Sequence, residues 1–308
     1  MDKICILLSS YNGEKYIEKQ IDTIYAQKNV DVSLLIRDDG STDDTINIIS
    51  RLQGKYKNLF LECGTNVGWK RSFMTLLKLV EKYGKFDYYG FSDQDDQWME
   101  DKCIRAIDII SKINVDSKCE PVLYGSNLFI TDENKNVKGK LYNSIKDLDS
   151  VNTSFCFGGT IYGCTMVWNQ PFQDILVKKM PTCNTPHDWW LMFIAKAYGE
   201  VALDYDCHIY HIIHGDNAAG IEKNPLKRIS KFFRVYFGKD YVKPSVIISE
   251  LLQLSANETI NNRDRFESVA NYSKNIRLFL TFIREIIFSE MDFKHKLRLF
   301  VFAIARRL

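Results

Sequence analysis

The sequence predicts an α/β protein with a doubly wound, mostly parallel sheet and a helical C-terminal extension. Strand-like and helix-like segments alternate through the first hundred residues in the order βαβαβαβ, as in parallel sheets covered by crossover helices. Each strand-like segment is an apolar run that ends in a polar loop. Ligands bind at the carboxyl ends of the strands in such sheets, so these loops mark the expected site.

Four strands and three helices are expected in this alternating part. Apolar runs predict strands at residues 3–9, 32–36, 59–63 and 88–91. Helices are predicted at 14–25, 43–52 and 69–82. In the first helix, Ile17, Ile21 and Ile24 lie on one face, and the second helix begins with a Ser-Thr-Asp sequence that can cap it.

The rest of the chain divides into two regions. Residues 121–206 mix strand-like runs (122–129, 164–168, 201–203), a polar hairpin (132–138) and a helix (187–197). No Pro- or Ser-rich linker precedes them, so they are expected to complete the same sheet within a domain at 1–220. Residues 221–308 form a basic, helical region, with helices expected at 278–288 and 297–305.

Composition narrows the class of protein. The formal net charge of +2 divides into −6 for residues 1–220 and +8 for 221–308, so the two regions are expected to have different roles. The eight cysteines show no C-x-x-C spacing, which favours a reducing cytosol without disulfides. No signal peptide and no run of about 18 apolar residues is visible. A cytoplasmic protein with only peripheral membrane contact is therefore expected.

Three carboxylates, Asp93, Asp95 and Asp96, lie within four residues at the end of the fourth predicted strand. Like charges this close repel, so a divalent cation is their natural partner, and oxygen ligands favour Mg²⁺ or Mn²⁺. An EF-hand is excluded, because Trp98 and Ile104 occupy the positions of its Gly and its bidentate Glu. A solvated acidic turn is the alternative. We expect Asp95 to bind the metal and Asp93 to face a ribose.

A second acidic turn, Asp38-Asp39-Gly40-Ser41, follows the second predicted strand. Turn formation and helix capping explain these residue types by themselves. The functional alternative is that Asp39 accepts hydrogen bonds from a nucleobase. This interpretation gains weight because the acidic cluster ends a strand of the same sheet.

Four motifs in order resemble a family 2 glycosyltransferase of the GT-A fold, and more narrowly bacterial rhamnosyltransferase-like enzymes. They lie at residues 7–13 (LLSSYNG), 37–43 (RDDGSTD), 66–68 (NVG) and 91–98 (FSDQDDQW), and the resemblance covers about residues 3–220. It implies that Asp93 and Asp95 form the D-x-D pair. It also implies a nucleotide-sugar site formed by Ser9, Tyr11, Asn12, Asp39, Asn66 and Asp93.

The resemblance further implies a catalytic base at the start of a helix near the acceptor, which places it at Asp188 in the sequence His-Asp-Trp-Trp. Helix capping is the structural alternative for this aspartate. Trp189, Trp190 and Trp98 are expected to bind the acceptor, because indole faces stack on sugar rings.

Three histidines, His208, His211 and His214, precede a Gly-Asp-Asn loop. A zinc site is not expected, because no acidic or Cys partner stands at a set spacing. His208 and His211 are expected to be structural. By resemblance, His214 completes the metal shell. The segment 210–213 lacks the arginine of related enzymes, which leaves open how the diphosphate is held on that side.

Residues 276–308 hold seven Lys and Arg against three Asp and Glu, among apolar residues at helical spacing. This pattern suits an anionic membrane surface, here the cytoplasmic face of the cell membrane. The alternative is packing on the core or on a second subunit in a homodimer. Nucleic-acid binding is not expected, because no recognised motif accompanies the aromatic residues.

These predictions combine into an inverting, metal-dependent glycosyltransferase. By resemblance the donor is dTDP-L-rhamnose or a UDP-sugar, and the acceptor is a hydroxyl of a growing, lipid-linked cell-surface polysaccharide. One alternative is a sugar-1-phosphate nucleotidyltransferase, although residues 9–14 hold one Gly and no Arg for a triphosphate. Another is a non-catalytic scaffold that binds a nucleotide sugar.

Overall fold

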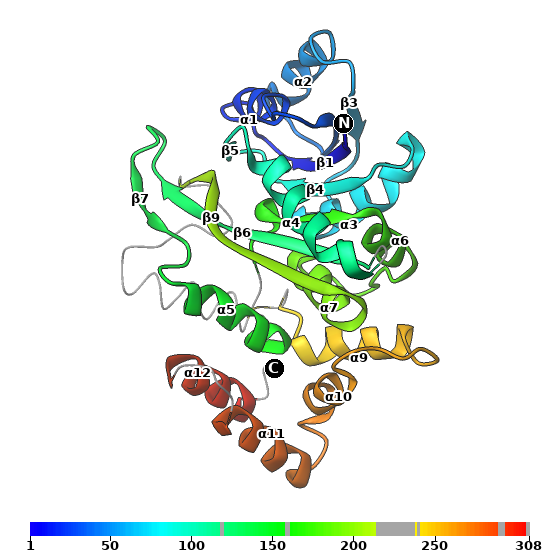
Figure 1. Ribbon diagram of the computed structural model, residues 1–308, viewed down its shortest axis with the longest axis vertical. Helices are drawn as coiled ribbons and strands as arrows, with labels where there is room; N and C mark the ends of the chain where they lie inside the picture. The colour runs from blue at the N-terminus through cyan, green and yellow to red at the C-terminus, as the bar shows by residue number, and fades with distance from the viewer. Residues whose placement is uncertain (118–119, 158–160, 214–237, 239–240, 289–292, 306–308) are drawn as a thin grey trace.

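A computed structural model describes residues 1–117, 120–157, 161–213, 238, 241–288 and 293–305 (Figure 1). The strands are β1 (Lys3–Ser10), β2 (Asp31–Asp38), β3 (Leu59–Cys63), β4 (Tyr88–Ser92), β5 (Gln97–Trp98), β6 (Val122–Thr131), β7 (Val137–Lys140), β8 (Val167–Asn169) and β9 (Glu200–Ile212). The helices are α1 (Ile17–Tyr25), α2 (Thr45–Gln53), α3 (Trp69–Leu79), α4 (Lys102–Ser117), α5 (Ile145–Ser154), α6 (Gln170–Lys178), α7 (His187–Tyr198), α9 (Pro244–Leu254), α10 (Arg263–Asn271), α11 (Ile276–Phe288) and α12 (Phe293–Ile304).

The strands form one sheet in the order β3-β2-β1-β4-β8-β6-β9-β5, with β7 beside β6. The first four strands of this order are parallel to one another, as predicted. The residues of β1, β2 and β4 are buried almost without interruption, because helices cover both faces of the sheet, whereas those of the edge strand β3 are mostly half-buried. The other half of the sheet is mixed, since β8 is antiparallel to β4 and β6, whereas β6 and β9 are parallel.

Apolar side chains of β1 alternate between two cores, one on each face of the sheet. Cys5 and Leu7 pack with α3, α6 and α7 on one face, and Ile4, Ile6 and Leu8 pack with α1, α2 and α4 on the other. This two-sided burial fixes the register, because a shift of one residue would exchange the two sets. The carboxyl ends of β1, β2 and β4 therefore meet at one edge.

The second half of the chain departs from the prediction in several places. The predicted strand 164–168 begins with a 3-10 turn (Gly163–Thr165), so β8 holds only three residues. The predicted strand 201–203 is part of the 13-residue β9. Helices α4, α5, α6, α9 and α10 were not predicted. The periodicity of α4 was visible in sequence, since its buried residues Cys103, Ala106, Ile107 and Ile110 follow helical spacing.

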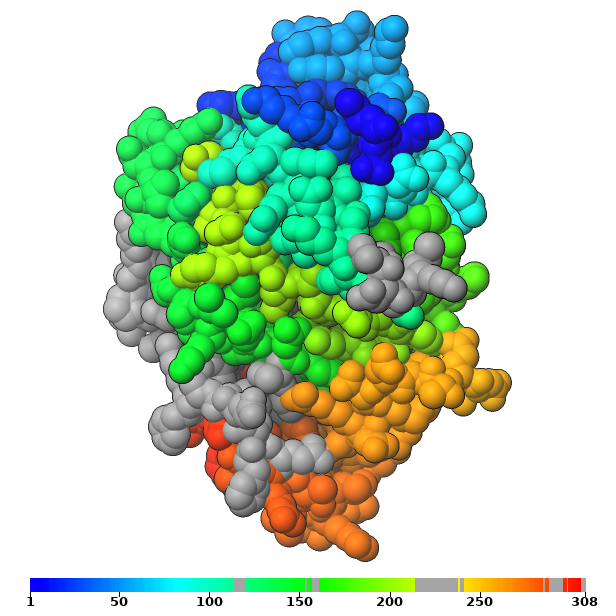
Figure 2. Space-filling model, in the orientation of Figure 1, coloured from blue at the N-terminus to red at the C-terminus, as the bar shows by residue number. Residues whose placement is uncertain are grey.

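The C-terminal helices lie at the lower end of the molecule (Figures 1 and 2). Ile247 and Leu251 of α9, Phe266 of α10 and Phe282 of α11 are buried in the same core as α7. Part of the C-terminal region therefore packs on the sheet domain. The predicted domain boundary at residue 220 lies outside the described residues. Among the helices that the structure describes, none is long and apolar enough to cross a membrane.

Candidate active site

The predicted polar loops come together because β1, β2 and β4 are adjacent and parallel. Ser10 pairs with Asp38 across β1 and β2, and Leu8 pairs with Ser92 across β1 and β4. The loops that leave these strands also bind one another. The Gln94 side chain accepts from the Tyr11 amide (2.9 Å) and donates to the Tyr11 carbonyl (3.1 Å). Gln94 thereby joins the first loop to the acidic loop after β4.

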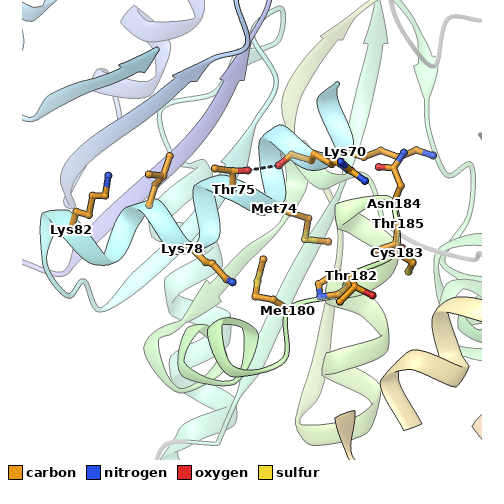
Figure 3. Close-up of a pocket in the computed structure, with 13 residues that line it drawn as sticks. Lys70, Met74, Thr75, Lys78, Lys82, Met180, Thr182, Cys183, Asn184 and Thr185 are labelled. Carbon is orange, nitrogen blue, oxygen red and sulfur yellow. Dashed lines mark hydrogen bonds between the residues drawn. The ribbon is translucent and has the colours of Figure 1, made fainter. Parts of the chain in front are cut away.

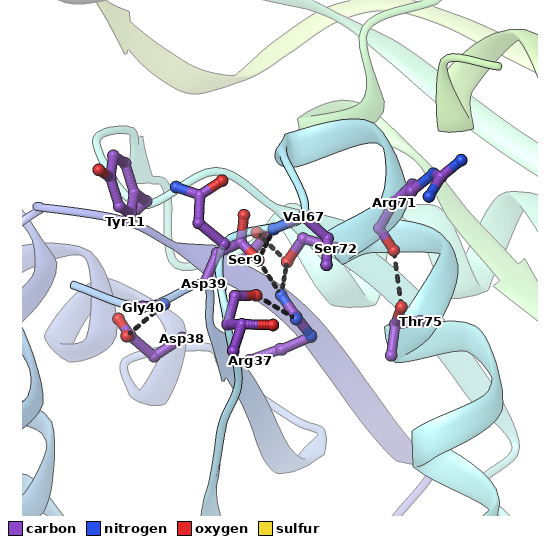
Figure 4. Close-up of polar contacts among 12 residues, drawn as sticks. Ser9, Tyr11, Arg37, Asp38, Asp39, Gly40, Val67, Arg71, Ser72 and Thr75 are labelled. Atoms are coloured by element: carbon purple, nitrogen blue, oxygen red, sulfur yellow. Dashed lines mark hydrogen bonds and ion pairs between the residues drawn. The ribbon is translucent and has the colours of Figure 1, made fainter. Parts of the chain in front are cut away.

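Asp39 is buried at the end of β2 and is held by the loop that precedes α3 (Figure 4). Its two carboxylate oxygens accept from the amides of Val67 (2.9 Å) and Gly68 (2.8 Å). The Arg37 guanidinium forms an ion pair with the same carboxylate. A carboxylate accepts about four hydrogen bonds, so one position remains for a ligand. A nucleobase contact by Asp39 stays a prediction.

A hydroxyl network continues from Arg37 into the floor of this site. Arg37 donates to the Ser72 hydroxyl (2.9 Å), and the Ser9 hydroxyl donates to Ser72 (2.6 Å). Ser72 thus links Ser9 to the Arg37–Asp39 ion pair, and a nucleoside contact by Ser9 stays a prediction. Tyr11, with 46% of its surface exposed, lies at the rim, where its ring is accessible to a ligand.

Two other residues of this region shape the loops. Asn12 accepts from the Thr42 amide (2.9 Å) through its side chain, and its own amide donates to the Ser41 hydroxyl (2.9 Å). The Asn66 side chain accepts from the Gly68 amide (3.1 Å) and is exposed. These contacts position the backbone around Asp39. Direct contact of Asn12 or Asn66 with a nucleotide stays a prediction.

The acidic loop after β4 carries concentrated negative charge. Burial raises the pKa of Asp93 well above its ordinary value, and the charges of Asp96 and Asp95 raise that pKa further. A cation at Asp93 and Asp95 would relieve this repulsion. The oxygen-only donor set therefore fits Mg²⁺ or Mn²⁺. His214, the other predicted metal ligand besides Asp95, lies outside the described residues.

Behind this loop lies a cluster that the sequence interpretation missed. Asp96, Cys164 and His211 are buried, and their potential ligand atoms lie within 4.8 Å of one another. His211 Nδ1 and Asp96 Oδ1 are 2.7 Å apart. A set that includes a thiol suits Zn²⁺ better than Mg²⁺, and the Asp96–His211 hydrogen bond already occupies one oxygen of the carboxylate and one nitrogen of the ring. We therefore interpret the cluster as a support that fixes the acidic loop against β9.

Asp188 lies in the first turn of α7, where packing of the preceding residue fixes its position. His187 is buried, and its ring lies 4.1 Å from the Phe73 ring of α3 and 4.8 Å from the Phe91 ring of β4. A Cβ on Gly163 would overlap the His187 ring, so only glycine fits there. Burial lowers the pKa of His187 to about 3, which keeps it neutral. His187 thereby anchors α7 to the strand that leads into Asp93.

The surroundings of Asp188 suit a general base. Burial raises its pKa to about 7, although the Trp189 amide, which donates to Asp188 Oδ1 (2.9 Å), and the charge of Lys70 oppose this rise. The charge of Asp188 in turn helps to raise the pKa of Asp93. The fold has therefore brought the predicted base within electrostatic range of the predicted metal site. A base with a pKa near the working pH is the most effective one.

The three tryptophans that were predicted to bind the acceptor differ in exposure. Trp98 and Trp190 are 4% and 0% exposed, so neither offers an indole face to a sugar. Trp98 pairs with Ile209 of β9 and lies under Lys102, and the Trp190 indole donates to the Lys179 carbonyl (2.9 Å). The prediction that these two bind the acceptor is therefore wrong, because both are core residues. Trp189 is only partly buried and remains a predicted acceptor contact.

Comparison with known proteins identifies the family. The chain belongs to glycosyl transferase family 2, whose family model matches residues 5–172. This confirms the predicted glycosyltransferase family. The predicted GT-A fold is confirmed by S. aureus TarS 1–349 in complex with UDP, which superposes with a TM-score of 0.57 at 14% identity. That superposition covers 96% of this chain and 78% of the TarS chain.

Three relatives extend the comparison. The dTDP-rhamnosyl transferase RfbG of Shigella flexneri is 32% identical over 61% of this chain and 65% of that protein. The uncharacterized glycosyltransferase alr2836 of Nostoc sp. is 29% identical over 37% and 34%. The putative teichuronic acid biosynthesis glycosyltransferase TuaG of Bacillus subtilis is 23% identical over 76% and 86%. The matches thus span less than two thirds of the Shigella and Nostoc proteins.

Proposed function

We propose that this protein is an inverting glycosyltransferase that moves a sugar from a nucleoside-diphosphate sugar to a hydroxyl of a cell-surface polysaccharide. Two observations carry the proposal: polar loops meet at the carboxyl ends of β1, β2 and β4, and the charge of Asp188 acts on Asp93 in one of these loops. Family membership, shared with proteins named for dTDP-rhamnose transfer and teichuronic acid biosynthesis, supports it.

Asp188 takes the proton from the acceptor hydroxyl in this proposal. The hydroxyl oxygen then bonds to the anomeric carbon as the bond from that carbon to the diphosphate breaks, and the configuration inverts. A base within hydrogen-bond reach of the hydroxyl contributes about 10²- to 10⁴-fold to such a step. A single displacement needs no covalent intermediate on the enzyme.

The donor is held by the two neighbouring loops. Asp39 and Ser9 face the nucleoside, Tyr11 covers it from the rim, and Asp93 faces the ribose. When bound, a divalent metal held by Asp95, with His214 as a further ligand, would neutralise charge on the diphosphate. L-Rhamnose is the proposed sugar because of the Shigella relative, and UDP-sugars are the alternative donors.

A thermal-shift screen tests this proposal. UDP, dTDP, GDP and their sugars are each added to the full chain with Mn²⁺, with Mg²⁺ or with EDTA. We expect one nucleoside diphosphate to raise the melting temperature in the presence of metal, and the corresponding sugar nucleotide to be turned over. The proposal fails if none of these nucleotides stabilises the protein under any metal condition.

We also propose that the acceptor is lipid-linked and that the C-terminal helices hold the enzyme at an anionic membrane. Ile276, Leu280 and Ile287 of α11 are 72%, 59% and 55% exposed and lie on one face of the helix. An apolar face within the basic region 276–308 suits an anionic lipid surface. We expect co-sedimentation with phosphatidylglycerol vesicles but not with phosphatidylcholine vesicles, and loss of binding in Ile276→Gln/Leu280→Gln.

The alternative occupant of this face is a second copy of the chain. Light scattering in the absence of lipid distinguishes the two. A stable dimer that dissociates in Ile276→Gln/Leu280→Gln, without any vesicle binding, would replace the membrane proposal.

A further inference from the structure

A cavity of about 380 Å³ lies between α3 and the loop at residues 180–185 that leads into α7 (Figure 3). Cationic side chains from α3 and the following turn line it, namely Lys70, Arg71, Lys78 and Lys82, and its lining contains no acidic residue. Met74 and Met180 provide an apolar floor. The cavity therefore combines positive charge with apolar surface, which suits an anionic group attached to an apolar chain.

Two of these cations are available to a ligand. Arg71, Thr75 and Lys78 follow helical spacing and form one stripe of α3, in which Arg71 and Lys78 are about 10 Å apart along the axis. Within the described residues, neither the Arg71 guanidinium nor the Lys78 ammonium has a hydrogen bond or an ion pair with a side chain. Lys82, by contrast, lies 3.6 Å from Glu62.

Lys70 and the loop that leads into α7 connect the cavity with the proposed base. Its loop wall ends at Thr185, three residues before Asp188. Lys70 lines the cavity, and its charge also acts on Asp188. A ligand in the cavity would thus lie on the acceptor side of Asp188, whereas Asp39 and its loop hold the donor side.

We propose that this cavity binds a phosphate group of the acceptor, through Arg71 and Lys78. The inference rests on the proposed function and specifies the acceptor as a phosphate-bearing molecule, such as a glycan on an isoprenoid diphosphate. Arg binds phosphate oxygens in a bidentate manner and Lys adds a point charge. The methionine floor would contact the first carbons of the attached chain.

The shape of the site favours a bound group over a flat lipid surface. Thr182 and Asn184 face α3 from the loop, so a phosphate would be enclosed from two sides. Lys78 points from α3 toward Met180 and this loop (Figure 3).

Calorimetric titration of the full chain in EDTA tests this inference. The probes are farnesyl diphosphate, inorganic diphosphate and farnesol. We compare the wild type with Arg71→Gln/Lys78→Gln and with a control of equal charge change, Lys57→Gln/Lys112→Gln. Lys57 and Lys112 are exposed and do not line the cavity.

We expect the dissociation constant for farnesyl diphosphate to rise at least tenfold in Arg71→Gln/Lys78→Gln and to stay within twofold of the wild type in the control. If inorganic diphosphate binds the wild type but not Arg71→Gln/Lys78→Gln, the site accepts free phosphate groups. If only farnesyl diphosphate binds in this way, the site is specific for a lipid-linked phosphate. The inference would be overturned if farnesyl diphosphate bound all three proteins with equal affinity, or if both variants lost the same amount of affinity for it. It would also be overturned if farnesol bound the wild type as tightly as farnesyl diphosphate does.

A parallel titration separates this inference from the proposed function. With Mn²⁺ present, donor nucleotide should bind Arg71→Gln/Lys78→Gln as it binds the wild type. If the donor binds but farnesyl diphosphate binding is independent of Arg71 and Lys78, only the phosphate subsite is rejected. If no nucleotide binds even the wild type, the proposed function itself fails.

Discussion

His211 Nδ1 lies 2.7 Å from Asp96 Oδ1, and this contact ties β9 to the acidic loop after β4. Both side chains are buried. Burial alone would lower the pKa of His211, but the charge and the hydrogen bond of Asp96 outweigh it, and the pKa rises to about 9. His211 is therefore protonated at neutral pH and places a positive charge behind three carboxylates.

Replacing His211 by Gln should destabilise the fold by about 3–5 kcal/mol, because a buried carboxylate loses its charged partner. Urea unfolding in EDTA at pH 6 measures this. The folded pKa of His211 lies above its ordinary value of 6.5. Its stabilisation is thus complete below pH 6.5 and is lost as the pH rises through about 9. The difference in the free energy of unfolding between the wild type and His211→Gln should therefore decrease as the pH rises from 6.5 to about 9.

The exposed Lys28–Glu100 pair provides the contrast. Lys28→Gln should leave the unfolding midpoint unchanged, because solvent screens such pairs. Two results would show that the buried Asp96–His211 pair does not support the loop. One is a His211→Gln variant as stable as Lys28→Gln, and the other is a difference in stability between the wild type and His211→Gln that increases with pH.

The pH dependence of turnover should report Asp188. Its pKa of about 7 is raised chiefly by burial, and the base is active only when it is ionised. Turnover at saturating donor should therefore rise tenfold per pH unit below about 7 and level off above it. Lys70→Gln removes a charge that lowers this pKa, so the variant should shift the rise to higher pH. A flat profile between pH 5 and 8 in the wild type would exclude Asp188 as the base.

Asp95→Asn should remove the metal-dependent part of nucleotide binding, because one carboxylate of the proposed metal site is lost. We expect the Mn²⁺-induced rise in melting temperature with nucleotide to disappear. Asp108→Asn, an exposed change of the same charge on α4, serves as the control. Equal Mn²⁺ responses in Asp95→Asn and wild type would place the metal elsewhere.

Gly68→Ala should weaken donor binding through the backbone. Gly68 has φ +82° and ψ +150° and donates its amide to Asp39 (2.8 Å), and a residue with a Cβ in this region costs about 1–3 kcal/mol. Gly84→Ala is a matched control, because Gly84 has φ +109° and open space around it but precedes the amino end of β4, whereas Asp39 lies at the carboxyl ends of the strands. Both variants should lose stability, and only Gly68→Ala should lose donor affinity. Equal affinity losses would contradict the role of the Asp39 loop.

The sequence predicted the parallel half of the fold because each strand there is an apolar run bounded by turn residues. The positions of Ser9, Asp39 and Asp93 at the sheet edge could be predicted because Ser9 lies at the end of its strand and Asp39 and Asp93 directly follow theirs; their contacts with a nucleotide stay predictions. The Asp96–His211 contact could not be predicted, since it joins residues 115 apart through the pairing of β5 with β9. Trp98 and Trp190 were misassigned because residue type alone does not distinguish a core indole from one that binds a sugar. Their burial depends on packing by β9 and α6, which local sequence does not encode.

Asp188→Asn is the variant that tests the central claim most directly. Donor binding and sugar transfer are measured on the same preparation with Mn²⁺. The account predicts that the dissociation constant for the nucleotide sugar stays within about threefold of the wild type, while transfer falls by about 10²- to 10⁴-fold. Transfer at the wild-type rate by a folded Asp188→Asn protein would contradict it.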